Sequence, residues 1–154
     1  MTSDDAGTSG GAPATPRPAT LPVGVVVVTH GQLATELVNA AEAIVGDLVN
    51  VAAVSIGWHD DVDLARGEIG AAIGRVATPG GTLVLTDMFG GTPSNLAVTF
   101  VMPGQVEVVT GVNLPMLLKL ANLREVTDLK AVARVVREHG QGAVWVASDL
   151  LEGK

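Results

Sequence analysis

Two reactive side chains, His30 and Asp87, stand just beyond short runs that are predicted to be strands: His30 two residues after the run at 23–28, and Asp87 one residue after the run at 82–86. A neutral imidazole nitrogen is a good nucleophile toward phosphorus. A carboxylate on the other ring nitrogen fixes the tautomer and stabilises the imidazolium-like product. If the two strands are neighbours, His30 and Asp87 lie at the same edge of the sheet and form a candidate phosphohistidine pair.

The segment after the strand at 82–86 can bind the oxygens of a phosphoryl group. A Gly-Gly pair lets backbone N–H groups approach an anion with no Cβ in the way. A helix predicted to open at Pro93 adds the positive end of its dipole. We therefore predict phosphoryl contacts from Gly90, Gly91, Thr92 and Ser94.

Each of these features also has a purely structural interpretation. A histidine after a strand can line a polar rim, an aspartate can cap a helix or end a strand in a turn, and Gly-Gly can be a turn alone. A receiver domain would also place an aspartate at position 87, but it needs an acidic pair where Thr29 and His30 stand. His30, His59 and Asp60 lack the spacing of metal ligands, so we expect no metal.

The elements that must position these residues alternate between apolar runs and amphipathic stretches. Strands are predicted at 23–28, 49–56, 82–86 and 105–110, and helices at 32–45, 61–76, 93–101, 114–121 and 127–139, the last with Thr127 as its N-cap. This alternation indicates a doubly wound α/β fold, with a mostly parallel four-stranded sheet and helices on both faces. A short extra strand is predicted at 143–146. Ligands of such folds bind beyond the carboxyl ends of the strands.

Composition divides the 154 residues into one domain and two tails. Residues 1–20 are rich in Gly, Ser, Thr, Ala and Pro and are predicted to be a disordered tail; residues 21–148 form the domain and 149–154 a C-terminal tail. The net charge of −7 argues against nucleic acid and anionic membranes as partners. No apolar run reaches the roughly 20 residues of a membrane span. The absence of cysteine is compatible with the cytoplasmic location that we predict.

Three segments carry a resemblance to a known family: VVVVTHG at residues 25–31, TDMFGGTPSN at 86–95 and TGVNLP at 110–115. The chain resembles, over about residues 22–147, the enzyme IIA component of the mannose family of the bacterial phosphoenolpyruvate–sugar phosphotransferase system. A sibling family, the phosphotransferase subunit of dihydroxyacetone kinase, has a different loop after the third strand and fits less well.

The resemblance implies that His30 receives a phosphoryl group on Nε2 from the phosphocarrier protein HPr. His30 would then pass the group to a histidine of a IIB component, here on a separate chain. Asp87 would orient the imidazole, and Thr92 would lie near the phosphoryl group. The resemblance further implies no cofactor, and a homodimer in which a C-terminal strand, here 143–146, pairs with the partner's sheet.

Two other functions use some of the same residues. In a free-standing regulatory module, the phosphorylation state of His30 would control binding to a partner protein. In a small-molecule binding domain, the glycine loop would be an anion site without covalent chemistry.

Apolar side chains beside His30 are candidates for partner docking. Leu33, Phe89 and Leu114 each follow a strand end, and we expect them to contact HPr. Trp58 either packs against the neighbouring helix or belongs to the same docking surface. Asn113 is expected to cap the helix that follows it.

Overall fold

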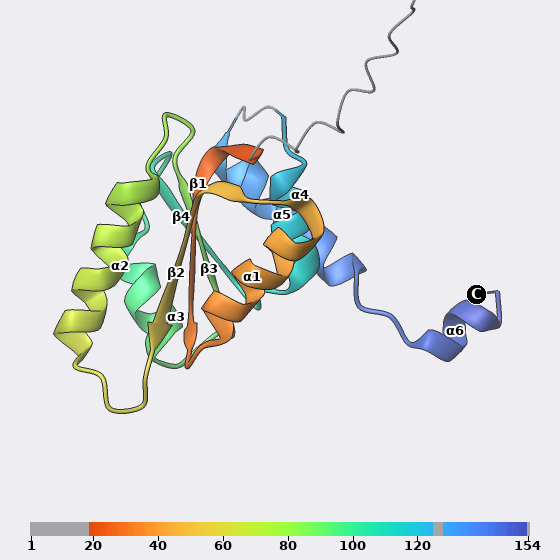
Figure 1. Cartoon of the computed structure of the whole chain (residues 1–154), viewed down its shortest axis with the longest axis horizontal. Helices are drawn as coiled ribbons and strands as arrows, with labels where there is room; N and C mark the ends of the chain where they lie inside the picture. The colour runs from red at the N-terminus through yellow and green to blue at the C-terminus, as the bar shows by residue number, and fades with distance from the viewer. Residues whose placement is uncertain (1–18, 125–127, 154) are drawn as a thin grey trace, which may run out of the picture.

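The structure is a computed structural model that describes residues 19–124 and 128–153. Its centre is a sheet of four strands in the order β2-β1-β3-β4, with every neighbouring pair parallel (Figure 1). The strands are β1 (Ala19–His30), β2 (Leu48–Ile56), β3 (Thr82–Thr86) and β4 (Val106–Thr110). This confirms the predicted four-stranded α/β fold.

The helices cover both faces of the sheet (Figure 1). One face packs against α1 (Leu33–Val45), α4 (Leu114–Ala121) and α5 (Leu129–Gly142). The other packs against α2 (Val62–Val76) and α3 (Thr92–Ala97), which continues into the 3₁₀ turn η1 (Val98–Phe100). The chain passes from β1 to β2 through α1, and then through α2 back across β1 to β3. These two right-handed crossovers run in opposite directions along the sheet, so their helices lie on opposite faces.

The valines of β1 show why this strand is central. Val25 and Val27 belong to the core under α1, α4 and α5, whereas Val26 and Val28 belong to the core under α2 and α3. All four are completely buried. A strand that alternates between two buried faces is apolar at every position, and β1 lies inside the sheet, between β2 and β3. The chain reverses its direction of travel between β1 and β3, so this is the switch point where ligands of such folds bind.

Some element ends differ from the prediction. The helix predicted over 93–101 keeps α-helical geometry only to Ala97 and then tightens into η1. β1 begins at Ala19, two residues before the predicted start of the domain at residue 21, and residues 1–18 lie outside the described residues. The cap predicted at Thr127 also lies outside them. In the described chain Asp128 caps α5, because its carboxylate accepts the N–H of Lys130.

The predicted strand at 143–146 does not form in the single chain. Ala143 follows α5 in a turn, and residues 144–146 have no strand neighbour within the part of the chain that the structure describes. They lead to the short helix α6 (Ala147–Leu151), which lies apart from the sheet (Figure 1) and contains the predicted boundary between domain and C-terminal tail. A strand needs a neighbour for its N–H and C=O groups, and this segment reaches none. No helix in the described ranges has both the length and the apolar content to cross a membrane.

Candidate active site

His30 and Asp87 meet where β1 and β3 end. The two strands are parallel neighbours with Val28 opposite Thr86, so the residues that follow them share one edge of the sheet. Oδ2 of Asp87 accepts the backbone N–H of His30 at 3.1 Å and lies 2.7 Å from the ring Nδ1. A carboxylate oxygen can only accept, so Nδ1 of the neutral ring carries the proton and Nε2 keeps its lone pair.

The Asp87 carboxyl group is held in its ionised form by His30. Burial raises the pKa of Asp87, but the hydrogen bonds from the ring and the backbone N–H of His30, with the charge of the imidazolium form, bring it below the ordinary value of 3.8. The exposed fraction of the side chain is 13% for Asp87 and 49% for His30. The carboxylate is therefore sheltered, while the imidazole remains accessible to a reaction partner.

Thr29 anchors the loop that presents His30. Its buried hydroxyl accepts the N–H of Ala34 in the first turn of α1 at 2.7 Å. On the other side of the histidine, the N–H of Gly31 donates to the carbonyl of Ile56 on β2 at 2.9 Å. Sequence reasoning missed the role of Thr29, although a hydroxyl residue just before a helix is a known capping signal.

The glycine loop passes against the imidazole ring. Gly91 has φ +87°, and a Cβ there would lie 3.2 Å from Cε1 and 3.3 Å from Nε2 of His30. Gly90 has a similar φ of +86°, but a Cβ there would meet no atom within 4 Å. Both positions favour glycine for their backbone conformation, and only Gly91 also needs it for the close approach of the ring.

The two hydroxyl residues of the loop differ in position. Thr92 is exposed and lines the same pocket as His30. Ser94 is placed differently from the prediction of a direct phosphoryl contact, because it is buried and its Oγ accepts the N–H of Gly90 at 3.2 Å. Ser94 therefore fixes the loop from below, and the backbone and hydroxyl of Thr92 remain at the pocket.

A cavity of about 480 Å³ lies in front of the imidazole, lined by His30, Gly31, Ile56, Gly57, Trp58 and Thr92. None of the six lining residues is Lys or Arg. Across residues 19–124 and 128–153, the structure holds no group of three or more His, Cys, Asp or Glu side chains that could bind a metal ion. An anion in this cavity would be bound by N–H and hydroxyl groups.

The candidate docking residues divide into two groups. Leu33 and Phe89 are 46% and 83% exposed and follow β1 and β3. Leu114 is half-buried and packs against the core under α4 and α5, which favours a structural role. Trp58 is 94% exposed, so the interpretation that it packs against a helix is wrong.

The loop after β4 is closed by Asn113. Its side-chain oxygen accepts the N–H of Met116, which confirms the predicted cap of α4. Its amide nitrogen donates to the carbonyl of Gly140 at 2.9 Å and so ties α4 to α5.

Several known proteins are similar to this chain in sequence. A family model described as PTS system fructose IIA component matches residues 24–137. The PTS system fructose-specific EIIA component of Bacillus subtilis (strain 168) is 30% identical over 131 residues, which cover 84% of this chain and 90% of that protein. The PTS system mannose-specific EIIAB component of Escherichia coli (strain K12) is 34% identical over 109 residues, 67% of this chain and 32% of that protein.

Solved structures agree with the sequence relatives. The mannose/sorbose specific IIA subunit of the phosphotransferase system from Enterococcus faecalis has a TM-score of 0.71 at 30% identity, and the match covers 82% of this chain and 95% of that one. The residues that the family model matches, 24–137, include His30, Asp87 and the glycine loop. The chain therefore belongs to the mannose family of IIA components of the sugar phosphotransferase system, whose members are phosphotransferases.

Proposed function

We propose that the protein is a phosphocarrier, which accepts a phosphoryl group from phosphorylated HPr on Nε2 of His30 and passes it to a histidine of a IIB component. The observation that carries the proposal is the 2.7 Å contact between Nδ1 and Asp87 Oδ2. It occupies one ring nitrogen and leaves the other as the nucleophile. This role implies a cytoplasmic location.

The transfer proceeds in line. The lone pair of Nε2 attacks phosphorus, the P–N bond of the donor phosphohistidine breaks, and the donor imidazole leaves with the electron pair. Positive charge grows on the His30 ring as the new bond forms. The Asp87 carboxylate offsets this charge through Nδ1–H and keeps the ring from rotating.

The oxygens of the transferred group face the loop at Gly91 and Thr92, since the N–H of Gly90, which was also predicted to bind them, already donates to Ser94 Oγ. The first N–H groups of α3 have no partner within the helix, and the hydroxyl of Thr92 stands beside them. Gly91 lets these donors approach Nε2 closely. Donors fixed before the reaction stabilise the transferring group without rearranging.

The test is the intact mass of the protein after incubation with enzyme I, HPr and phosphoenolpyruvate. The wild type should gain one phosphoryl group that mild acid removes, and His30→Ala should gain none. Equal gain in both proteins would place the modification elsewhere and end the proposal. Addition of a IIB domain then distinguishes the regulatory alternative, because a carrier loses its phosphoryl group to IIB and a purely regulatory module keeps it.

We also propose that the protein is a homodimer in which the C-terminal segment of each chain binds the other chain. Val144, Trp145 and Val146 are 75%, 63% and 63% exposed on a segment that leaves the domain (Figure 1). Val146 has extended backbone angles. An extended apolar segment that is largely exposed in its own chain suits a position along a sheet edge.

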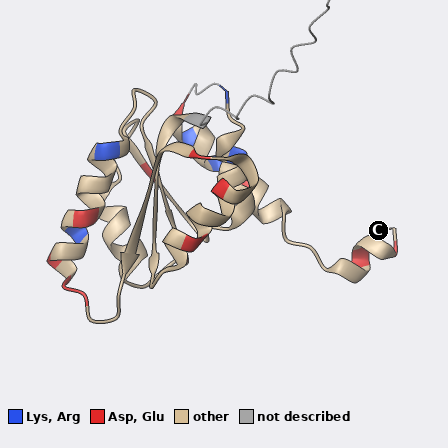
Figure 2. Cartoon of the chain, viewed as in Figure 1, with Lys and Arg blue, Asp and Glu red and all other residues tan. Residues whose placement is uncertain are grey.

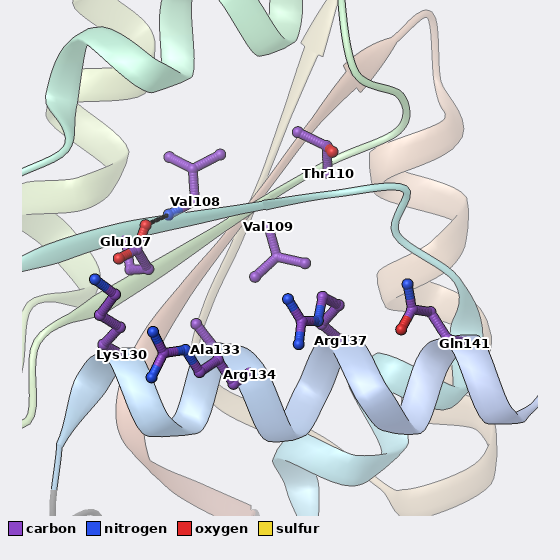
Figure 3. Close-up of a pocket in the computed structure, with 9 residues that line it drawn as sticks. All are labelled: Glu107, Val108, Val109, Thr110, Lys130, Ala133, Arg134, Arg137 and Gln141. Carbon is purple, nitrogen blue, oxygen red and sulfur yellow. Dashed lines mark hydrogen bonds between the residues drawn. The ribbon is translucent and has the colours of Figure 1, made fainter.

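The matching surface is the groove between β4 and α5, a cavity of about 500 Å³ (Figure 3). β4 is an edge strand, and within the described chain the N–H of Val108 is bonded by the side chain of Glu107 rather than by a further strand. Lys130, Arg134 and Arg137 line the helix side and would face Asp149 and Glu152 of the other chain.

Sedimentation velocity of the full chain should show a dimer, and Val144→Asp with Val146→Asp should give a monomer. A wild-type monomer at high concentration would contradict the dimer.

A further inference from the structure

Trp58 is the most exposed of the large hydrophobic side chains that the structure describes, at 94%. It also lines the cavity in front of His30, opposite the glycine loop. Exposure of a complete indole ring leaves a large apolar surface in water. The mechanism proposed for His30 gives this ring no task, so its position beside the nucleophile needs an explanation of its own.

The turn that carries Trp58 is tied at several points. Asp60 Oδ2 accepts the N–H of Gly57 at 2.6 Å, and the N–H of Asp60 donates to the Gly57 carbonyl at 3.2 Å. Asp61 then caps α2 by accepting the N–H of Leu64. These hydrogen bonds hold the backbone of the turn, so a partner that binds Trp58 loses less entropy than one that must also order the turn.

A second exposed aromatic residue lies on the other side of His30. β1 has β2 on one side and β3 on the other, so Trp58, after β2, and Phe89, after β3, flank the histidine. Phe89 is 83% exposed. Two apolar surfaces around one nucleophile suit a partner that is wider than a phosphoryl group, which is to say a protein.

The charge of the turn narrows the choice of partner. Asp60, Asp61 and Asp63 follow Trp58 directly, and Figure 2 shows this acidic stretch between β2 and α2. The nearest cation along the chain, Arg66, lies over the ring of Phe100 at 5.5 Å. An acidic rim repels a free anionic phosphoryl donor and attracts a protein whose own phosphohistidine is surrounded by basic side chains.

We propose that Trp58 is a docking residue for the phosphoryl-donor protein, whose apolar surface covers the indole while a basic rim faces the acidic turn. The inference rests on the proposed phosphocarrier function, and it identifies Trp58 as the residue by which the protein selects its phosphoryl donor. Trp58 touches the donor protein and takes no part in the P–N bond exchange. It should therefore affect how tightly the donor binds and leave the chemical step unchanged.

The first experiment compares two donors. With phosphorylated HPr, Trp58→Ala should raise the KM for the donor by about tenfold or more, as truncation of an aromatic anchor does, with the limiting rate little changed. Trp58→Phe should restore most of the affinity. With phosphoramidate, a small donor whose P–N bond breaks to release ammonia, Trp58→Ala should match the wild type. The matched control is Ile44→Ala, which removes a 60% exposed side chain near the far end of α1, about 16 Å along the helix from Leu33.

The outcomes separate the two proposals. Equal slowing of Trp58→Ala with both donors would mean that the indole shapes the pocket for chemistry, and no slowing with HPr would mean that it does not dock; either result overturns the inference alone. A wild type that takes phosphoryl groups from neither donor would overturn the proposed function and this inference with it.

A second readout observes the indole directly. Trp58 and Trp145 are the two tryptophans of the chain, so Trp145→Phe leaves Trp58 as the single emitter. Unphosphorylated HPr should shift its emission to shorter wavelength and protect it from acrylamide. Binding without either change would overturn the inference.

Discussion

The cavity at His30 and the groove between β4 and α5 have similar volumes, about 480 and 500 Å³, and opposite chemical character. The groove is lined by Lys130, Arg134 and Arg137 and contains no histidine. The cavity at His30 has no basic residue in its lining and an acidic turn beside it. A search for an anion site by charge alone would select the groove.

If His30 carries the phosphoryl group as proposed, its site depends on placed hydrogen-bond donors rather than on net positive charge. In the proposed reaction the glycine loop would supply N–H groups, and the carboxylate of Asp87, 2.7 Å from Nδ1 of His30, would offset the charge that grows on the ring. In the groove, exposed guanidinium groups lie along an open sheet edge, an arrangement that fits an acidic, extended segment of another chain.

The largest effect beyond loss of His30 itself is expected from Asp87→Asn. An amide cannot offset the charge on the ring and can donate to Nδ1, which would hold the wrong tautomer. Single-turnover phosphorylation by HPr should slow by about 10²- to 10⁴-fold, as in other carboxylate–histidine pairs. Circular dichroism should show an intact fold. An Asp87→Asn variant that is phosphorylated at the wild-type rate would mean that the carboxylate has no part in the reaction. The cavity at His30 would then lose the feature that sets it apart from the groove.

Gly91→Ala should have a smaller effect, and Gly90→Ala is its matched control. Both substitutions place a Cβ at positive φ and should destabilise the fold by about 1 kcal/mol each. Only the Cβ at position 91 crowds the His30 ring, so only Gly91→Ala should also slow phosphorylation, by about tenfold. Thermal melts and the same kinetic assay measure the two effects. Equal slowing in both variants would assign the effect to backbone strain.

Arg134→Ala with Arg137→Ala tests the other side of the comparison. The double variant should weaken dimer association in sedimentation experiments, most clearly at low salt, because it removes two cations that would face the acidic C-terminal segment of the other chain in the proposed dimer. Its phosphorylation by HPr should equal that of the wild type. A slowed phosphorylation would mean that the groove contributes to the chemistry after all.

The smallest expected effect is the contribution of Asp87 to the free energy of unfolding, which should depend on pH. The pKa of Asp87 is lowered in the folded protein, so its ionised form stabilises the fold above the ordinary value of 3.8. This contribution should decrease as the pH falls below 3.8 through the lower value of the folded state. Urea unfolding of the wild type and of Asp87→Asn should therefore give a difference in unfolding free energy that shrinks in acid. A difference that grows in acid would contradict a lowered pKa.

The amino-acid sequence by itself determined the order of strands and helices and the choice of His30 and Asp87 as the reactive pair. Apolar β-branched strands alternating with amphipathic helices allow few architectures, and His30 and Asp87 stand at two strand ends where such folds bind ligands. The capping role of Asn113 followed from local chemistry alone, since a side-chain amide competes for the first N–H groups of a helix.

Tertiary structure decided which side chains face the reaction and which support it. Ser94 and Thr92 are close in sequence, yet one is buried under the loop and the other lines the pocket. Leu114 packs into the core while Trp58 stands in water, a difference that hydrophobicity cannot reveal because both residues are apolar. The segment at 143–146 has a strand-like sequence but no strand, because strand formation depends on a neighbour and a sequence does not specify where that neighbour lies.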